Sequence, residues 1–180
     1  RVLKSQGNRI VFALRDVRSA AAMLRNEGME VLQAPTHPDR FFPSNGPQPQ
    51  SMADVLSVFG FTNPKSLQGL AASWQSLIEL VRPDVLVANY APLSLLCARQ
   101  AGIPSAVICI PFELPPKIHP VPAFRPGALA PQVRSDEKVI ATVNSVFGEA
   151  FVSSVHQIFD ADRTFLATFE EMDPFSPRPN

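Results

Sequence analysis

Short apolar runs alternate with amphipathic stretches along this chain. The runs have the length of buried strands, and between them apolar residues recur at spacings of three and four, which is typical of helices. One such stripe extends from Val17 to Leu24, with Asp16 placed to cap the helix and Gly28 placed to end it. The predicted strands are residues 9–14, 29–33, 85–88, 105–110 and 164–168.

The same pattern predicts the remaining helices and the fold class. Strand, helix and strand within about 25 residues form a unit whose two strands are parallel and whose crossover is right-handed. Unbroken apolar strands suit a sheet that is covered on both faces. We therefore predict a doubly wound, mostly parallel α/β sheet with helices on both faces. The further predicted helices are residues 52–59, a helix preceded by Ser66 and stopped by Pro83, residues 91–101, and a long helix capped by Ser135 or Asp136 that reaches Ile158.

Proline clusters mark two long loops. The chain has 19 prolines in 180 residues, and twelve of them fall within residues 35–49 and 111–131. Each cluster begins where a predicted strand ends, and long loops of this kind in a compact domain are commonly binding loops. The two loops therefore leave the same edge of the predicted sheet.

That edge is the predicted ligand site, because open parallel sheets bind ligands beyond the carboxyl ends of their strands. Aromatic side chains with few polar groups would suit a largely apolar molecule that carries a hydroxyl. Glu113 could orient such a hydroxyl or simply cap its own loop, and Asp16 is better explained as a helix cap. Candidate residues at this edge are Arg15, Asp16, Pro35, Thr36, His37, Phe41, Phe42, Asn89, Tyr90, Pro111, Phe112, Glu113 and Phe124.

Composition narrows the class of protein. Apolar residues make up 46% of the chain, and sixteen basic residues balance sixteen acidic ones, so we expect no nucleic-acid partner. No apolar run approaches the length of a membrane span, and Cys97 and Cys109 are expected to be small core residues in a cytoplasmic protein. The chain carries no glycine-rich phosphate loop, no G-x-S-x-G elbow and no metal-ligand spacing, so we predict neither a metal nor a cofactor.

Three stretches together resemble the GT-B glycosyltransferases of the UDP-glucuronosyl and macrolide glycosyltransferase group. Residues 82–92 (RPDVLVANYAP) resemble that group's PDxVVADYAP segment, and residues 98–104 (ARQAGIP) resemble its A-x-x-x-G-I-P helix end. Residues 164–173 (TFLATFEEMD) are similar to the segment near the end of its N-terminal domain, and residues 1–35 are similar to its early strands and helices. The resemblance covers most of the chain but matches poorly in the two proline loops.

The resemblance implies an acceptor-side Rossmann-like domain. Residues 1–173 would form this domain without its first strand, and residues 174–180 would begin the interdomain linker. The general-base histidine would lie upstream, and the domain that binds the UDP-sugar donor would lie downstream. Asn89 stands where the family often has the aspartate that orients this histidine. The acceptor-binding residues would be Tyr90, Phe112, Glu113, Thr36, Phe41 and Phe124.

The implied activity is an inverting transfer of a hexose from a nucleotide sugar to a hydroxyl of an apolar acceptor. The fragment alone would be inactive. With Asn89 in place of the aspartate, the histidine would work unassisted, or Glu113 would replace the aspartate, or the catalytic function would be weakened. Two alternatives remain open. One is a non-catalytic, acceptor-binding subunit of a split glycosyltransferase. The other is a sugar-nucleotide epimerase of the same fold, whose edge loops should carry more charged residues than these do.

Overall fold

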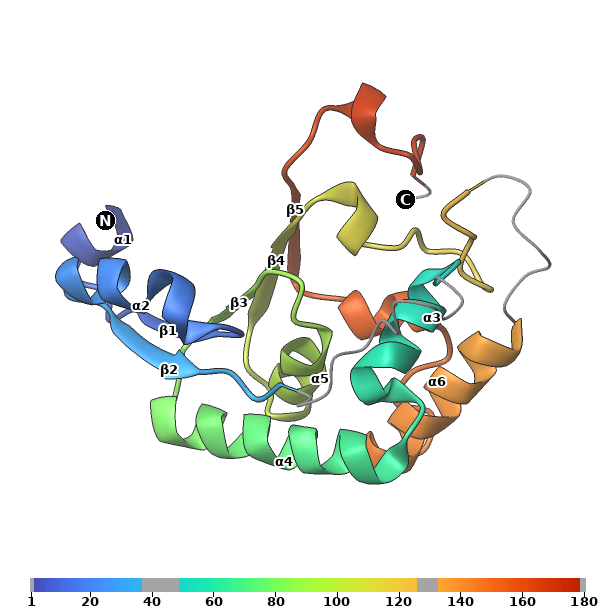
Figure 1. Ribbon diagram of the computed structural model, residues 1–180, viewed down its shortest axis with the longest axis horizontal. Coiled ribbons are helices and arrows are strands. Elements are labelled where there is room, and N and C mark those ends of the chain that lie inside the picture. The colour runs from blue at the N-terminus through green and yellow to red at the C-terminus, as the bar shows by residue number, and fades with distance from the viewer. Residues whose placement is uncertain (1, 37–48, 126–132, 179–180) are drawn as a thin grey trace.

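The computed structural model describes residues 2–36, 49–125 and 133–178, which form a mixed α/β structure (Figure 1). All five strands predicted from the apolar runs are present, and each differs from its predicted bounds by no more than two residues at either end. The strands are β1 (Val11–Leu14), β2 (Glu30–Gln33), β3 (Leu86–Ala88), β4 (Ser105–Cys109) and β5 (Arg163–Leu166). The helices are α1 (Val2–Ser5), α2 (Val17–Asn26), α3 (Met52–Leu56), the π-helical η1 (Ser57–Phe61), α4 (Pro64–Val81), α5 (Pro92–Gln100), η2 (Pro111–Glu113), α6 (Val133–Phe147), η3 (Val155–Phe159) and η4 (Glu170–Met172).

The N-terminal elements form a βαβ unit at one end of the molecule (Figure 1). Strands β1 and β2 pair in parallel from Val11 opposite Glu30 to Leu14 opposite Gln33. As predicted, Asp16 caps α2, since its carboxylate accepts a hydrogen bond from the backbone N–H of Arg18 at 2.9 Å. None of the residues in β1, α2 or β2 is fully buried. The unit therefore contributes little to the core.

Strands β3, β4 and β5 form a second parallel sheet in that order. Helix α5 covers one of its faces, where Leu95 packs with Ala88, Val107 and Cys109. The opposite face is exposed and carries one large apolar residue on each strand, namely Val87, Ile108 and Phe165. The side chains of a parallel strand alternate between faces, so these three residues lie on the same side of the sheet.

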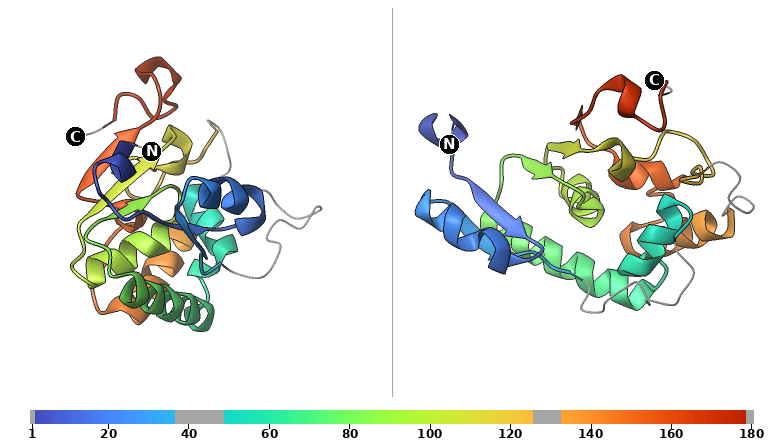
Figure 2. Two further views of the ribbon diagram at one scale, coloured as in Figure 1. Left: turned by 90° about the vertical axis from the view of Figure 1, so that its left-hand side faces the viewer. Right: turned by 45° about the horizontal axis from the view of Figure 1, so that its top comes forward.

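The main core lies among the helices. Two views show α4 running beneath α5, with α3 and α6 at its N-terminal end (Figure 2). The apolar stripes of the predicted helices face this core. Where α3 passes into η1, the hydroxyl of Ser57 donates to the carbonyl of Ala53 at 2.8 Å. The fully buried members of this core include Met52, Leu56, Leu67, Leu96, Cys97, Val139, Val143, Val155 and Ile158.

Three predicted helices have different bounds in the structure. The helix predicted at residues 52–59 is α3 followed by η1, and the backbone is not helical at Phe59 and Gly60. Helix α4 begins at Pro64 rather than after Ser66, because the side chain of Asn63 caps it and Pro64 fits its first turn. The long helix predicted to reach Ile158 is wrong in its length. It ends at Phe147, and Gly148 (φ 122°) and Ala150 (φ 58°) then turn the chain into the separate helix η3.

The start of α6 also differs from its prediction. Neither Ser135 nor Asp136 caps this helix, which begins at Val133. Asp136 lies inside the first turn with its side chain fully buried, and its Oδ2 accepts the backbone N–H of Val121 at 2.9 Å. Its buried carboxylate therefore joins α6 to the chain that follows β4.

The sheet prediction is confirmed at the level of a mixed α/β fold with parallel strands. Among the residues described, the strands make one two-stranded and one three-stranded sheet rather than one continuous sheet. The helices in this part of the chain lack the combination of length and apolar character that crossing a bilayer requires.

Candidate functional site

The residues that follow the strands were the predicted site, and the structure brings several of them together. Asn89 and Tyr90 directly follow β3, and Arg15 directly follows β1. The turn η2 follows β4 after one intervening residue, Ile110. Tyr90 adopts a φ of 43°, a left-handed conformation that is costly for a residue with a side chain. Such strain persists where the surrounding structure holds it, and it is common at ligand sites.

Tyr90 is the centre of this arrangement. Its hydroxyl donates to the sulfur of Met52 at 3.8 Å, and its ring meets Phe59 edge to face with centroids 6.3 Å apart. The guanidinium of Arg15 lies over the same Phe59 ring, 5.4 Å from its centroid. Burial and, to a smaller extent, the charge of Glu113 raise the pKa of Tyr90 to about 12, against a lowering effect of the charge of Arg15. Tyr90 is therefore a neutral hydroxyl at physiological pH.

Phe112 and Phe124 form a second aromatic contact, with ring centroids 4.4 Å apart. Phe112 is 48% exposed at η2, whereas Phe124 is partly buried against the helical core. The backbone N–H of Phe124 donates to the carbonyl of Gln50 at 2.8 Å, which joins the loop after β4 to the segment before α3. An exposed ring backed by a fixed one offers a flat apolar surface to a ligand.

Glu113 caps its own turn. Its Oε2 accepts the backbone N–H of Ile110 at 3.2 Å. This hydrogen bond agrees with the interpretation that Glu113 caps its own loop. Its negative charge also contributes to the raised pKa of Tyr90.

Asn89 uses its amide to connect two strands. Its Nδ2 donates to the carbonyl oxygen of Ile108, at 2.8 Å, so β3 and β4 are joined just beyond their ladder. A carboxylate cannot donate this bond, so an aspartate at this position would place a negative charge against a carbonyl oxygen. The side-chain oxygen of Asn89 is its acceptor atom, so a donor such as an imidazole N–H would bind to this oxygen.

Other predicted residues are not part of this cluster as described. Thr36 follows β2 in the two-stranded sheet and is exposed. Phe41, along with His37 and Phe42, lies outside the described residues. The strand-end rule also missed Met52 and Phe59, which come from α3 and η1. No sequence signal identifies these two residues, because neither follows a strand; the helical pattern that carries them ends at Gly60, whose φ is 87°.

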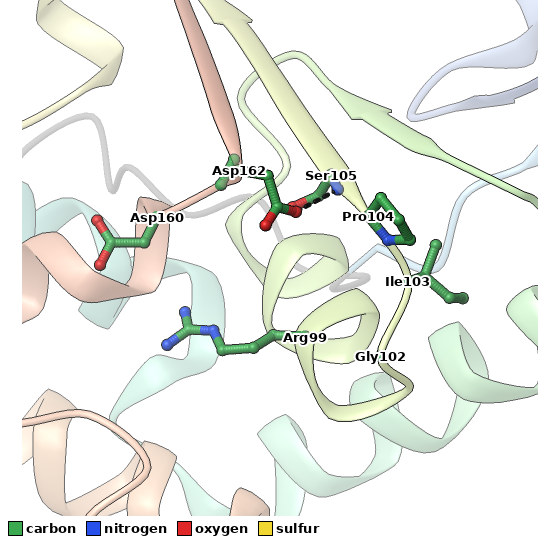
Figure 3. A pocket seen from close by; sticks show the side chains of 8 residues that line it. Arg99, Gly102, Ile103, Pro104, Ser105, Asp160 and Asp162 are labelled. Carbon is green, nitrogen blue, oxygen red and sulfur yellow. Dashed lines mark hydrogen bonds between the residues drawn. The ribbon is translucent and has the colours of Figure 1, made fainter.

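An open pocket of about 460 Å³ lies at the opposite edge of the sheet. It is lined by Arg99, Asp160, Asp162 and the start of β4, and the Asp162 carboxylate accepts the backbone N–H of Ser105 at 2.7 Å (Figure 3). Ligands of open parallel sheets bind at the carboxyl ends, whereas this pocket lies at the amino ends. The candidate site is therefore the Tyr90 edge, where the carboxyl ends of the strands lie.

The described residues also limit the chemistry of the site. In this part of the chain, no group of three histidine, cysteine or acidic side chains is arranged to hold a metal ion. Cys97 and Cys109 are free and buried, and burial raises the pKa of Cys97 to about 12, so this thiol is not a nucleophile at neutral pH. The site offers aromatic surface, a hydroxyl, an amide and two charged groups.

Comparison with known proteins adds no assignment. The chain matches no protein-family model, and no curated protein is significantly similar to it. Its function must therefore be argued from the geometry of the site and from the sequence motifs.

Proposed function

We propose that this chain is the acceptor-binding half of a nucleotide-sugar-dependent glycosyltransferase of the GT-B type. The observation that carries the proposal is the pair of aromatic contacts at the carboxyl ends of the strands, Tyr90 with Phe59 and Phe112 with Phe124, together with the charges of Glu113 and Arg15 that act on Tyr90. An apolar acceptor would lie against the rings, while the polar groups fix its hydroxyl. The resemblance of residues 82–92 supports the same interpretation, since this segment supplies Asn89 and Tyr90.

The arrangement of strands supports a doubly wound sheet for this domain. Strands β1 and β3 are edge strands of their sheets, and both sheets are parallel. One further parallel strand between them would give the order β2, β1, added strand, β3, β4, β5. The crossovers would then run in opposite directions from the added strand, which makes it the switch point where such sheets bind ligands. Arg15 and Tyr90 would flank that point.

The proposed reaction divides the work between two domains. The acceptor hydroxyl attacks the anomeric carbon of the nucleotide-bound hexose, the nucleoside diphosphate leaves, and the configuration of the sugar inverts. The nucleotide sugar binds mainly to the donor domain, and a histidine outside these residues accepts the hydroxyl proton. The residues described here hold and orient the acceptor, and alone they catalyse no transfer.

One observation favours a second candidate, a non-catalytic acceptor-binding subunit. Asn89 stands where the related enzymes often carry an aspartate, and its amide is engaged with the carbonyl of Ile108. An asparagine provides no charge to stabilise a protonated histidine. Sugar transfer by a protein in which this chain is the only acceptor domain would favour the catalytic candidate over the non-catalytic subunit.

The test is a transfer assay on the protein that contains this chain. UDP-glucose serves as donor, and a panel of hydrophobic alcohols that includes 1-naphthol serves as acceptor. We expect Phe112→Ala to raise the acceptor KM by about tenfold, because it removes the exposed ring of the site. The matched control is Phe169→Ala, whose side chain is 74% exposed on a different turn. The absence of both transfer and donor hydrolysis would count against a catalytic role.

Substitution of Asn89 tests the relay and the strand contact together. Asn89→Ala removes the bond to Ile108 and should lower the free energy of unfolding by about 1 kcal/mol. Asn89→Asp should be less stable than Asn89→Ala at neutral pH, because it also places a charge against the carbonyl oxygen. Urea denaturation measures this order, and the reverse order would contradict it. If Asn89→Asp leaves the transfer rate unchanged, Asn89 takes no part in orienting the base.

A further inference from the structure

The segment after β5 folds back onto the turn that carries Phe112 and Glu113. Arg178 makes the contact, with Nη1 donating to the carbonyl of Leu114 at 2.8 Å and Nη2 donating to the carbonyl of Pro111 at 3.0 Å. These two carbonyls belong to the first residue of η2 and to the residue that follows it. Arg178 therefore forms hydrogen bonds with both ends of the turn.

Asp173 holds Arg178 in this position. Its Oδ2 lies 2.5 Å from Nε of Arg178, and its Oδ1 accepts the backbone N–H of Phe175 at 2.9 Å. Both charged side chains are largely buried, with 18% of Arg178 and 6% of Asp173 exposed. Burial alone would raise the pKa of Asp173, but the hydrogen bonds from Arg178 and Phe175 lower it below its ordinary value. The pair is thus ionised and bound in place.

The guanidinium is suited to this arrangement because of its shape. Its planar fork presents several N–H groups in fixed directions, so one side chain reaches a carboxylate and two carbonyls at once. The ring of Phe175 also lies 5.4 Å from the guanidinium carbon. A lysine would keep the charge but could not hold all three acceptors in the same geometry.

We propose that Arg178 is a positioning residue for the acceptor site. It locks η2 so that Phe112 faces the ligand edge against Phe124 and Glu113 stays within reach of Tyr90. This inference rests on the proposed acceptor site. It extends that site to a segment that sequence reasoning assigned to the domain end and linker, and it links the position of that segment to acceptor binding. Such a link is reciprocal, so a bound acceptor should also tighten the grip of Arg178.

The first experiment needs no ligand. In the protein that contains this chain, Arg178→Lys should increase hydrogen exchange at the Glu113 and Leu114 amides by about tenfold, because the turn opens more often. Arg163→Lys is the matched control, since Arg163 is exposed and its Nη1 donates to the carbonyl of its neighbour Asp162 at 3.2 Å. Wild-type exchange at the turn in Arg178→Lys would overturn the proposed lock.

The second experiment measures binding of 1-naphthol by its own fluorescence, so it does not depend on sugar transfer. We expect Arg178→Lys to weaken naphthol binding about tenfold while circular dichroism shows the protein fully folded. We also expect naphthol to shift the Arg178 Nε–H resonance in the wild-type protein, which a purely structural ion pair would not show. Unchanged affinity, or no naphthol binding by the wild type, would overturn the positioning role. Naphthol binding without any transfer would instead contradict only the catalytic part of the proposed function.

Discussion

Tyr90 is the residue on which the site depends, and it can be observed directly. It is the single tyrosine of the chain, so the ultraviolet absorbance of tyrosinate reports this side chain alone. Its pKa is raised to about 12 chiefly by burial, with Glu113 raising it and Arg15 lowering it. We expect Glu113→Gln to lower the pKa, though not to that of a free tyrosine, and Arg15→Gln to raise it. Glu137→Gln on the exposed face of α6 is the control and should leave the titration unchanged.

The same shift makes the fold sensitive to high pH. An unfolded tyrosine loses its proton near pH 10, whereas folded Tyr90 keeps its proton until about pH 12. The folded state therefore binds more protons than the unfolded state in this window, so stability falls as the pH rises from 10 to 12. The part of this loss that falls between pH 9 and pH 11 should be on the order of 1 kcal/mol and should be smaller in Tyr90→Phe. Urea midpoints at pH 9 and pH 11 measure it, and equal losses in both proteins would exclude Tyr90 as the source.

The position of a residue in the fold was predictable where a simple rule applied, whereas its role in a site stays a prediction. The strand-end rule places Tyr90, Phe112 and Glu113 after the carboxyl ends of β3 and β4, where the structure has them. It could not find Phe59, which follows no strand and comes from η1 to meet the ring of Tyr90. The bond from Asn89 to Ile108 was equally hidden, since sequence does not tell which atom a side-chain amide selects.

At the scale of elements, hydrophobic periodicity predicted the strands and most helices, and it failed where backbone geometry decides. The apolar stripe continues past Phe147, so the pattern alone predicts one long helix. The chain turns at Gly148 and Ala150, and the same apolar residues are buried from two separate helices instead. Burial was correctly predicted there, but the path of the backbone was not.

The N-terminal βαβ unit is the weakest set of elements. None of the residues in β1, α2 or β2 is fully buried, whereas α5 is almost entirely buried. We expect the amides of β1 and β2 to exchange through local opening, with lower protection than those of β4. Hydrogen exchange under native conditions measures this difference. Equal protection in the two sheets would show that they unfold as one unit.

Two matched leucine substitutions make the same comparison by stability. Leu96→Ala on α5 should lower the free energy of unfolding by about 2–5 kcal/mol, because Leu96 has no exposed surface. Leu24→Ala on α2 should cost clearly less, because Leu24 is only partly buried. Urea denaturation followed by Trp74 fluorescence reports the core, and similar costs for the two variants would contradict a peripheral N-terminal unit.

At the scale of the whole molecule, the sheet of β3, β4 and β5 leaves apolar side chains exposed on one of its faces. Parallel sheets are normally covered on both faces, and α5 covers only one face of β3, β4 and β5. The other face carries Val87, Ile108 and Phe165, with 57%, 45% and 55% of their surfaces exposed; Ile108 stands opposite Phe165, and Val87 stands opposite Ala106. Apolar surface of this kind, contiguous across three strands, is typical of a surface that associates.

We therefore expect residues 1–180, prepared alone, to self-associate in a concentration-dependent way. Sedimentation velocity measures this, and Ile108→Lys with Phe165→Lys should shift the protein toward the monomer, because two charges then interrupt the apolar face. The control is Leu80→Lys, since Leu80 is 72% exposed on α4, away from this face. All variants should remain folded, because surface substitutions change the free energy of unfolding by only about 0.5 kcal/mol. A wild-type chain that stays monomeric at every concentration, or an equal effect of the Leu80 variant, would show that this face drives no association.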